Sequence, residues 1–189
     1  MGREFELKYA ATPAALEVIR NDGENWTQIS METAYFDTPD GVLAEKKCTL
    51  RRRMENGVSV CTLKTPADGF GRGEWDRNAP WCEETVKALF AAAGLESIPF
   101  EKLSSVCGAR FTRLAKKVEL SNCTLEIALD QGILSGGGRE IPLCEVEVEC
   151  KDGDETTVAA WAQRLAEKYG LQPEQFSKFY RAFSLAKGE

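Results

Sequence analysis

The chain has 189 residues, enough for one domain with a sizeable core, and its 43% hydrophobic and 29% charged residues are ordinary for a globular protein. Its net charge of -6 argues against a general nucleic-acid binder, which would carry a basic surface. Histidine is absent, which excludes histidine-based acid–base chemistry, Ser-His catalysis and histidine-ligated zinc.

Cysteine usage and the first residues indicate the compartment. The seven cysteines form no C-x-x-C pair and several lie in strand-like apolar stretches, so we interpret them as reduced, mostly buried thiols. The first residues, MGREFELK, are charged and lack the apolar region of a signal peptide. No apolar run approaches the ~18–20 residues of a membrane span. These features predict a cytoplasmic protein without a membrane segment.

The first elements are a strand and a helix. Residues 3–10, REFELKYA, alternate polar and apolar side chains and predict a strand over 2–9. Thr12 is a residue type that caps helices, and Pro13 is favoured at a first helical position. A helix is therefore expected over 13–21.

A β-hairpin is the clearest element of the next stretch. After a strand in QISMETAYFDTP, the turn pair Asn56-Gly57 separates the β-rich runs KCTLRRRME and VSVCTLKT. Asn-Gly between two such runs is the strongest short-range hairpin signal. A further short strand is expected over 72–77.

Longer elements are predicted in the second half. A helix is expected over 83–93, ended by Gly94, and a second short helix near 99–106. DETTVAAWAQRLAEKYG predicts a helix capped by Asp154, and PEQFSKFYRAFSLA predicts a last helix. Between these helices we expect long strands at 109–120, 123–134 and 139–151. Eight strands in mostly hairpin order, with helices between and after them, indicate an α+β domain on an antiparallel sheet or barrel.

Charged side chains gather on one face of many predicted strands. Such faces can be solvated on an open sheet, or they can line a closed barrel whose apolar faces lie under helices, and the alternation alone leaves both open. Acids gather on the first and last strands and bases on those between, which favours the lined interior. Carboxylates two positions apart on one face lie ~7 Å apart, which suits two oxygen ligands of one cation. The charged sets are Glu4, Glu6 and Lys8; Arg51 and Arg53; Lys64; Arg72, Glu74 and Asp76; Glu126 and Asp130; and Glu145, Glu147 and Glu149.

An ordered series of motifs carries a resemblance to a known family. The series is the E-x-E-x-K strand, YFDTPDGVL, LRRR, TLK, RGEWD, FTR, EIALDQG, CEVEVE and SK-x-x-R, over about residues 2–186. It resembles the CYTH family, or triphosphate tunnel metalloenzymes, and in detail the CYTH domain of bacterial inorganic triphosphatases. The resemblance implies a single α+β CYTH domain over 1–189. In the bacterial inorganic triphosphatases a helical CHAD domain often follows, and none is expected in this chain. Its eight antiparallel strands would close into a β-barrel, the tunnel, with helices packed outside.

The resemblance also implies roles for individual residues. Mg²⁺ or Mn²⁺ would be bound by Glu4, Glu6, Glu147 and Glu149, with Asp130 and Glu145 as further ligands. The catalytic set would be Glu4, Glu6, Lys8, Glu147 and Glu149. Phosphates would be bound by Lys8, Arg51, Arg53, Lys64, Arg72, Arg113, Lys178 and Arg181. Arg110 is out of phase with Arg113, and Arg52 points to the opposite face from its neighbours, so neither is included.

The implied reaction is metal-dependent hydrolysis of inorganic triphosphate to diphosphate and phosphate. A cage of bases would hold the anion and stabilise the charge of a loose phosphoryl-transfer transition state. The alternatives are a CYTH-type adenylate cyclase, a thiamine or nucleoside triphosphatase, and a non-catalytic polyphosphate- or nucleotide-binding module. The expected partner is a small-molecule triphosphate, with no nucleic acid and no membrane; a monomer and a homodimer both stay open.

Overall fold

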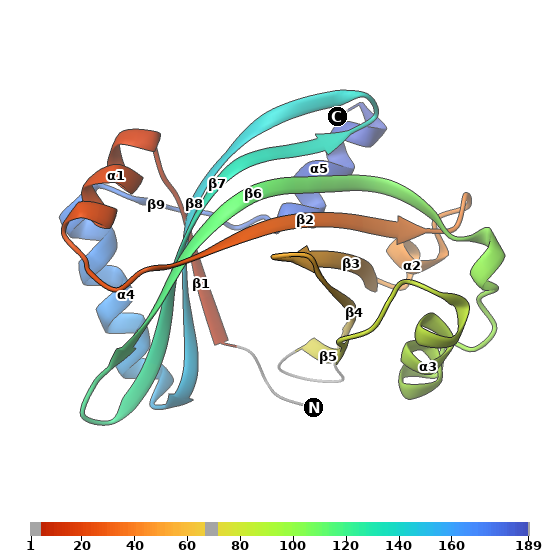
Figure 1. Cartoon of the computed structure of the whole chain (residues 1–189), viewed down its shortest axis with the longest axis horizontal. Helices are drawn as coiled ribbons and strands as arrows, with labels where there is room; N and C mark the ends of the chain where they lie inside the picture. The colour runs from red at the N-terminus through yellow and green to blue at the C-terminus, as the bar shows by residue number, and fades with distance from the viewer. Residues whose placement is uncertain (1–4, 67–71, 189) are drawn as a thin grey trace.

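The computed structural model describes residues 5–66 and 72–188, and its main feature is a strongly curved antiparallel sheet (Figure 1). The strands follow the order β5-β4-β3-β2-β6-β7-β8-β1-β9. Their bounds are β1 Phe5–Ala10, β2 Thr27–Asp37, β3 Thr49–Glu55, β4 Val58–Pro66, β5 Arg72–Arg77, β6 Ser104–Glu119, β7 Cys123–Gly136, β8 Arg139–Gly153 and β9 Gln172–Pro173.

The expected eight-stranded closed barrel is wrong. The sheet has nine strands, and over residues 5–66 and 72–188 it is not closed, because β5 pairs with β4 at one edge and β9 pairs with β1 at the other. Closure would need the two outermost strands to hydrogen-bond to each other. Figure 1 shows that the long strands β6, β7 and β8 bend instead, so that the sheet forms an arch with β1 and β5 beneath it.

Two helices cover the outer face of the sheet at the β1 side. They are α1 (Pro13–Asn21) and α4 (Glu155–Tyr169), at the left of Figure 1. Fully buried Val146 and Val148 of β8 belong to the apolar cluster that both helices join. Because strand side chains alternate, the opposite face of β8 is left to Glu145, Glu147 and Glu149, and we call that face the inner face.

A second group of helices covers the other end of the sheet. Helix α3 (Glu83–Ala93) packs on β4 and β5, with Leu63 and Phe90 buried in the cluster that it forms there. The short helix α2 (Val42–Glu45) and the 3₁₀ turn η1 (Phe100–Lys102) lie at the same end.

Helix α5 (Lys178–Lys187) corrects the expectation that all helices lie outside, because it packs on the inner face. Its Ala182 is fully buried beside Leu134 of β7 and Leu143 of β8. Both leucines lie on the inner face, because they share the alternation of Asp130 and Glu145 on the same strands. Gly136 permits this close approach, since a Cβ there would collide with the carbonyl oxygen of Ala182. The helix is thereby positioned to reach across the inner face.

Most of the predicted elements are confirmed, with shifted ends. The helices over 13–21 and 83–93 are present, and both turn residues of the hairpin have positive φ, 48° for Asn56 and 85° for Gly57. The helix near 99–106 is wrong, because only one 3₁₀ turn forms before β6 begins. The last helix starts later than its motif, at Lys178.

The thiols agree with the sequence interpretation. All seven cysteines are free, and Cys48, Cys61, Cys107 and Cys123 are buried. Burial raises the pKa of Cys107 to about 12, so its thiol stays protonated. Among the helices of the described residues, none has the length and apolar character needed to cross a bilayer.

Candidate functional site

A cavity of about 1210 Å³ lies against the inner face of the sheet. Most of the residues predicted for the site line it, namely Glu6, Lys8, Arg51, Arg53, Lys64, Arg113, Glu147, Glu149 and Lys178. Asp130 and Glu145 form ion pairs with Lys178 of this lining, and Arg181 pairs in turn with Glu145. Glu4 and the side chain of Arg72 lie outside the described residues. The structure therefore brings together residues from both ends and the middle of the chain.

A row of carboxylates runs across three neighbouring strands at one side of the cavity. The pairing register sets Glu6 opposite Glu149, and Glu149 opposite Glu126. Like charges directly opposite each other destabilise a sheet, so this row favours a bound cation. Lys151 Nζ lies 2.7 Å from Glu149 and 3.9 Å from Glu126, and Lys8 Nζ lies 3.5 Å from Glu6. Glu6 and Lys8 belong to β1, Glu126 to β7, and Glu149 and Lys151 to β8. All five side chains line the cavity.

A second group of carboxylates is buried deeper and is paired with bases. Lys178 Nζ of α5 contacts Glu145 and lies 2.8 Å from Asp130 and 2.7 Å from Glu147. Arg113 binds Asp130 through two hydrogen bonds of 2.8 and 2.7 Å and also contacts Glu147. We call these five residues the buried ion cluster. Charges this deeply buried are stable only when paired in this way.

Pairing and burial act in opposite directions on the pKa values of the buried ion cluster. Burial alone would raise the pKa of Glu147, but Lys178 and Arg113 outweigh it and hold that pKa well below its usual range. Burial raises the pKa of Glu145, and the attraction of Lys178 and Arg181 opposes this rise. Burial lowers the pKa of Lys178, and the three carboxylates more than reverse this effect, so its ammonium stays charged.

The opposite wall of the cavity is basic and belongs to β3. Arg53 is 8% exposed; its Nε donates to Thr33 Oγ1 at 3.2 Å and its Nη1 lies 3.8 Å from Glu55. Burial and the neighbouring charge of Arg51 lower the pKa of Arg53 to about 10. Arg51 Nη2 lies 3.8 Å from Glu74, and its buried Nε has no hydrogen-bond partner among the described residues. This wall therefore has positive charge and donors that its carboxylates do not fully satisfy.

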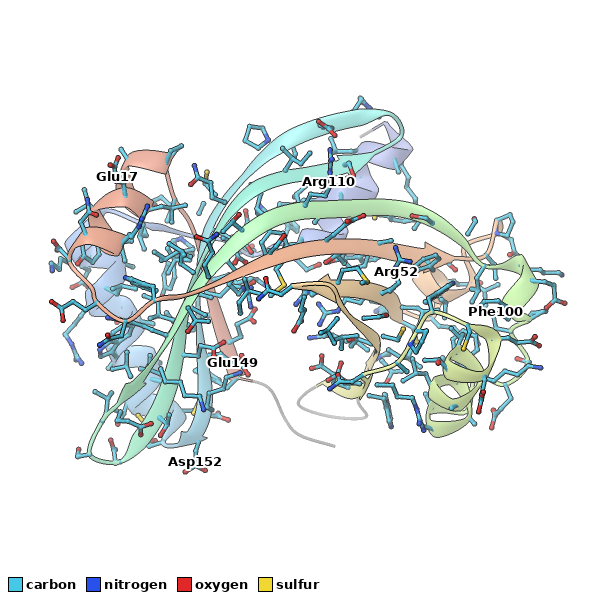
Figure 2. All side chains as sticks on the ribbon, viewed as in Figure 1. Glu17, Arg52, Phe100, Arg110, Glu149 and Asp152 are labelled. Carbon is cyan, nitrogen blue, oxygen red and sulfur yellow. The ribbon has the colours of Figure 1, made fainter. Side chains whose placement is uncertain are left out.

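Two arginines that the alternation set aside lie elsewhere (both are labelled in Figure 2). Arg110 is exposed and pairs with Glu140 at 3.1 Å. Arg52 is half-buried and does not line the cavity, although Arg51 and Arg53 on either side of it do. Strand periodicity alone was sufficient to separate these arginines from the cavity.

Phe111 is a site residue that the sequence reasoning missed. Its ring centroid lies 5.9 Å from Arg113 Cζ and 5.3 Å from Lys178 Nζ, so two cations of the buried ion cluster lie over one aromatic ring. The signal was present in the FTR motif, because Phe111 precedes Arg113 by two positions and must share its face.

The carboxylates offer two places for a divalent cation. Asp130, Glu145 and Glu147 have oxygens within 4.8 Å of one another, but Lys178 and Arg113 already contact these oxygens. The row formed by Glu6 and Glu149 has the same oxygen chemistry and lines the cavity directly. The donor set therefore fits a divalent cation that prefers oxygen ligands at the cavity wall. Glu147 lies on β8 between Glu145 of the first group and Glu149 of the second.

Comparisons with known proteins agree with this architecture. The structure resembles that of an adenylyl cyclase candidate from Hippeastrum, described as having a dominant triphosphatase activity, with a TM-score of 0.72 and 18% identity over 97% of this chain and 96% of that one. It also resembles an adenylate cyclase candidate from Bacillus halodurans, with a TM-score of 0.69 and 22% identity over 97% of this chain and all of that one. At these identities the likeness concerns the fold alone.

Sequence comparison gives the family. An inorganic triphosphatase of Haemophilus influenzae is 26% identical to this chain over 200 residues, 98% of this chain and 55% of that protein. The chain thus spans about half the length of this curated relative. The CYTH domain profile matches residues 2–183. With nearly the whole chain matched, and with the acidic and basic walls of the cavity where the motifs placed them, the chain belongs to the CYTH domain family.

Proposed function

We propose that this chain hydrolyses inorganic triphosphate to diphosphate and phosphate, with Mg²⁺ or Mn²⁺ bound in the cavity. The observation that carries the proposal is the basic wall of β3. Arg51 and Arg53 both face the cavity. The buried Nε of Arg51 has no hydrogen-bond partner among the described residues, and the pKa of Arg53 is lowered. A polyanion satisfies both, because it supplies acceptors and opposite charge at once.

The bases divide by chemistry into two kinds of phosphate contact. The guanidinium groups of Arg51, Arg53 and Arg113 suit bidentate hydrogen bonding to phosphate oxygens. The ammonium groups of Lys8 and Lys64 act as point charges, and we propose that they neutralise the ends of the anion. Holding the phosphates in line and neutralising their charge is most of what phosphoryl transfer requires of a protein.

We propose that Glu4, Glu6, Glu147 and Glu149 hold the metal. A bound divalent cation would supply charge neutralisation at the phosphate oxygens and lower the pKa of a water. Asp130 and Glu145, first expected as further ligands, are better explained as counter-charges, because both are fully buried behind the cavity lining and their oxygens contact Lys178, Arg113 and Arg181. In this role they hold three bases in position for the substrate. Glu147 also contacts Lys178 and Arg113, but it lines the cavity on the same strand as Glu149 and so stays within reach of a bound cation.

The relatives support the reaction class. The Haemophilus protein is called an inorganic triphosphatase, and the Hippeastrum protein is described as having a dominant triphosphatase activity. These descriptions favour hydrolysis over cyclisation for a cavity of this type, although the first protein is longer than this chain.

The test is a substrate panel on the purified chain. Tripolyphosphate, thiamine triphosphate, ATP and diphosphate are each assayed with Mg²⁺ or Mn²⁺ for released phosphate, and ATP also for cyclic AMP. We expect tripolyphosphate to give the highest kcat/KM, diphosphate to be poor because it reaches fewer bases, and EDTA to abolish turnover reversibly. Cyclic AMP as the main product would replace the proposal with a cyclase. Tight binding of tripolyphosphate without turnover of any substrate would make the chain a binding module.

A further inference from the structure

A second cavity lies on the outer face of the sheet, on the other side from the charged cavity. Its volume is about 300 Å³, and it is formed where the end of α1 and the segment before β2 meet α4. Lys116 and Ile127, which are paired between β6 and β7, form its floor. Lys116 lies three positions after Arg113, which lines the charged cavity, so the two side chains point to opposite faces of β6 and the sheet itself separates the two cavities.

Aromatic rings form much of the lining of this outer cavity. Trp26, Trp161 and Tyr169 all contribute to it, and each is partly buried against the apolar cluster under α1 and α4. Trp26 is fixed by a 3.0 Å hydrogen bond from its Nε1 to the carbonyl oxygen of Arg20. Partly buried rings around a concavity give a flat apolar ligand surfaces to pack on.

The charges around these rings are mainly positive. The lining holds Lys116, Arg164 and Lys168 against a single carboxylate, Asp22, in a chain whose net charge is -6. Lys168 Nζ lies 3.0 Å from Asp22, so that carboxylate is already matched. Lys116 Nζ lies 4.9 Å from the centroid of the Trp26 ring, which holds a cation directly at the aromatic wall. The lining of this cavity therefore carries a net positive charge.

We infer that the outer cavity binds a small planar aromatic compound carrying an anionic group, such as a nucleoside monophosphate. The ring would pack against the aromatic wall while the anionic group pairs with Lys116 and Arg164. A volume at the lower end of the range for ligand pockets suits one ring system with one anionic group rather than a dinucleotide. The inference does not depend on the reaction proposed for the charged cavity.

The test is isothermal titration of the whole chain, in EDTA, with AMP as the probe. Adenosine and inorganic phosphate serve as probes that lack the charge or the ring, and 4-hydroxybenzoate replaces the phosphate with a carboxylate. We expect AMP to bind at least about tenfold more tightly than adenosine or phosphate, since each lacks one of the two contacts. Tighter binding of 4-hydroxybenzoate than of AMP would support the same class and identify an aromatic acid as the better ligand.

Variants assign the binding to one cavity. Lys116→Ala and Arg164→Ala should each weaken AMP binding by about tenfold or less, and their combination by more. Lys117→Ala, on the opposite face of the same strand, and Arg51→Ala, in the charged cavity, should leave it unchanged. Binding that is lost in Arg51→Ala but kept in the first two variants would overturn the inference, as would no detectable binding of AMP and 4-hydroxybenzoate at millimolar concentration.

Discussion

Replacing Lys178 with methionine should destabilise the fold more than any other single change of a lysine that the structure describes. Lys178 is 6% exposed and contacts Glu145, Asp130 and Glu147, so the substitution leaves three buried carboxylates with too little positive charge. Breaking a buried ion pair by removing one partner costs ~3–5 kcal/mol, because the remaining charge is uncompensated. We expect a loss of that size in the free energy of unfolding, measured by urea titration at pH 7.

A matched control lies on the same helix. Lys187, at the other end of α5, is exposed, and Lys187→Met should change the free energy of unfolding by less than ~0.5 kcal/mol. If Lys178→Met also cost less than ~1 kcal/mol, the pairing of Lys178 within the buried ion cluster would not be a significant source of stability, and the account given of the cluster would be refuted.

The pH dependence of the Lys178→Met variant provides an independent check. In the native chain the pKa of Glu147 is held low, so its carboxylate contributes stability above the unfolded pKa of ~4.3, and this is lost as the pH falls. Without Lys178, burial should raise the pKa values of the carboxylates, so the folded chain binds protons more readily than the unfolded one. The stability of the variant should therefore rise from pH 7 toward pH 5. A gap to the native chain that stays constant over this range would contradict the reasoning.

Three further predictions concern other parts of the site. Arg51→Ala should weaken tripolyphosphate binding by about 10–100-fold, because it removes charged hydrogen bonds to the anion, while Arg52→Ala should change this binding less than about twofold. Equal effects of the two variants in titration calorimetry would mean that Arg51 and Arg52 are assigned to the wrong faces of β3. Gly136→Val should lower the free energy of unfolding by more than ~2 kcal/mol, since the added side chain collides with α5, and an unchanged melting temperature would argue against this packing. Glu6→Gln should raise the Mg²⁺ concentration needed for half-maximal turnover and leave the melting temperature in EDTA unchanged or higher; an unaltered metal dependence would remove Glu6 from the metal site.

Local sequence signals predicted the strands and their faces well. The Asn56-Gly57 hairpin and the alternation in TLRRRME were enough to place Arg51 and Arg53 in the cavity and Arg52 outside it. The same alternation placed Glu147 and Glu149 on the face opposite Val148. These successes have a common cause, because side-chain direction along a strand is fixed by the backbone and needs no knowledge of the partner strands.

Local sequence signals could not predict whether the sheet closes or which face the last helix covers. Whether the outermost strands pair depends on the bend and stagger of the whole sheet, and no single strand encodes either. No local pattern predicts that Gln172 and Pro173 occupy the edge beside β1. Likewise, the apolar stripe of α5 predicts a packed helix but not which face of the sheet it covers. That face also depends on distant residues, among them Gly136 of β7, which leaves room for the helix.

The pairing of β1 with β8 affects the order in which the chain can fold. Glu6 and Glu149, which stand opposite each other, are separated by most of the sequence, and α5 comes later still. During synthesis β1 has no partner in the sheet until β8 has left the ribosome, and Asp130, Glu145 and Glu147 lack Lys178 until α5 docks. Contacts between such distant segments slow folding and leave apolar side chains such as Phe5 and Leu7 unprotected in the meantime. The pairing of β1 with β8 is therefore where we expect refolding to be slowest and aggregation to begin.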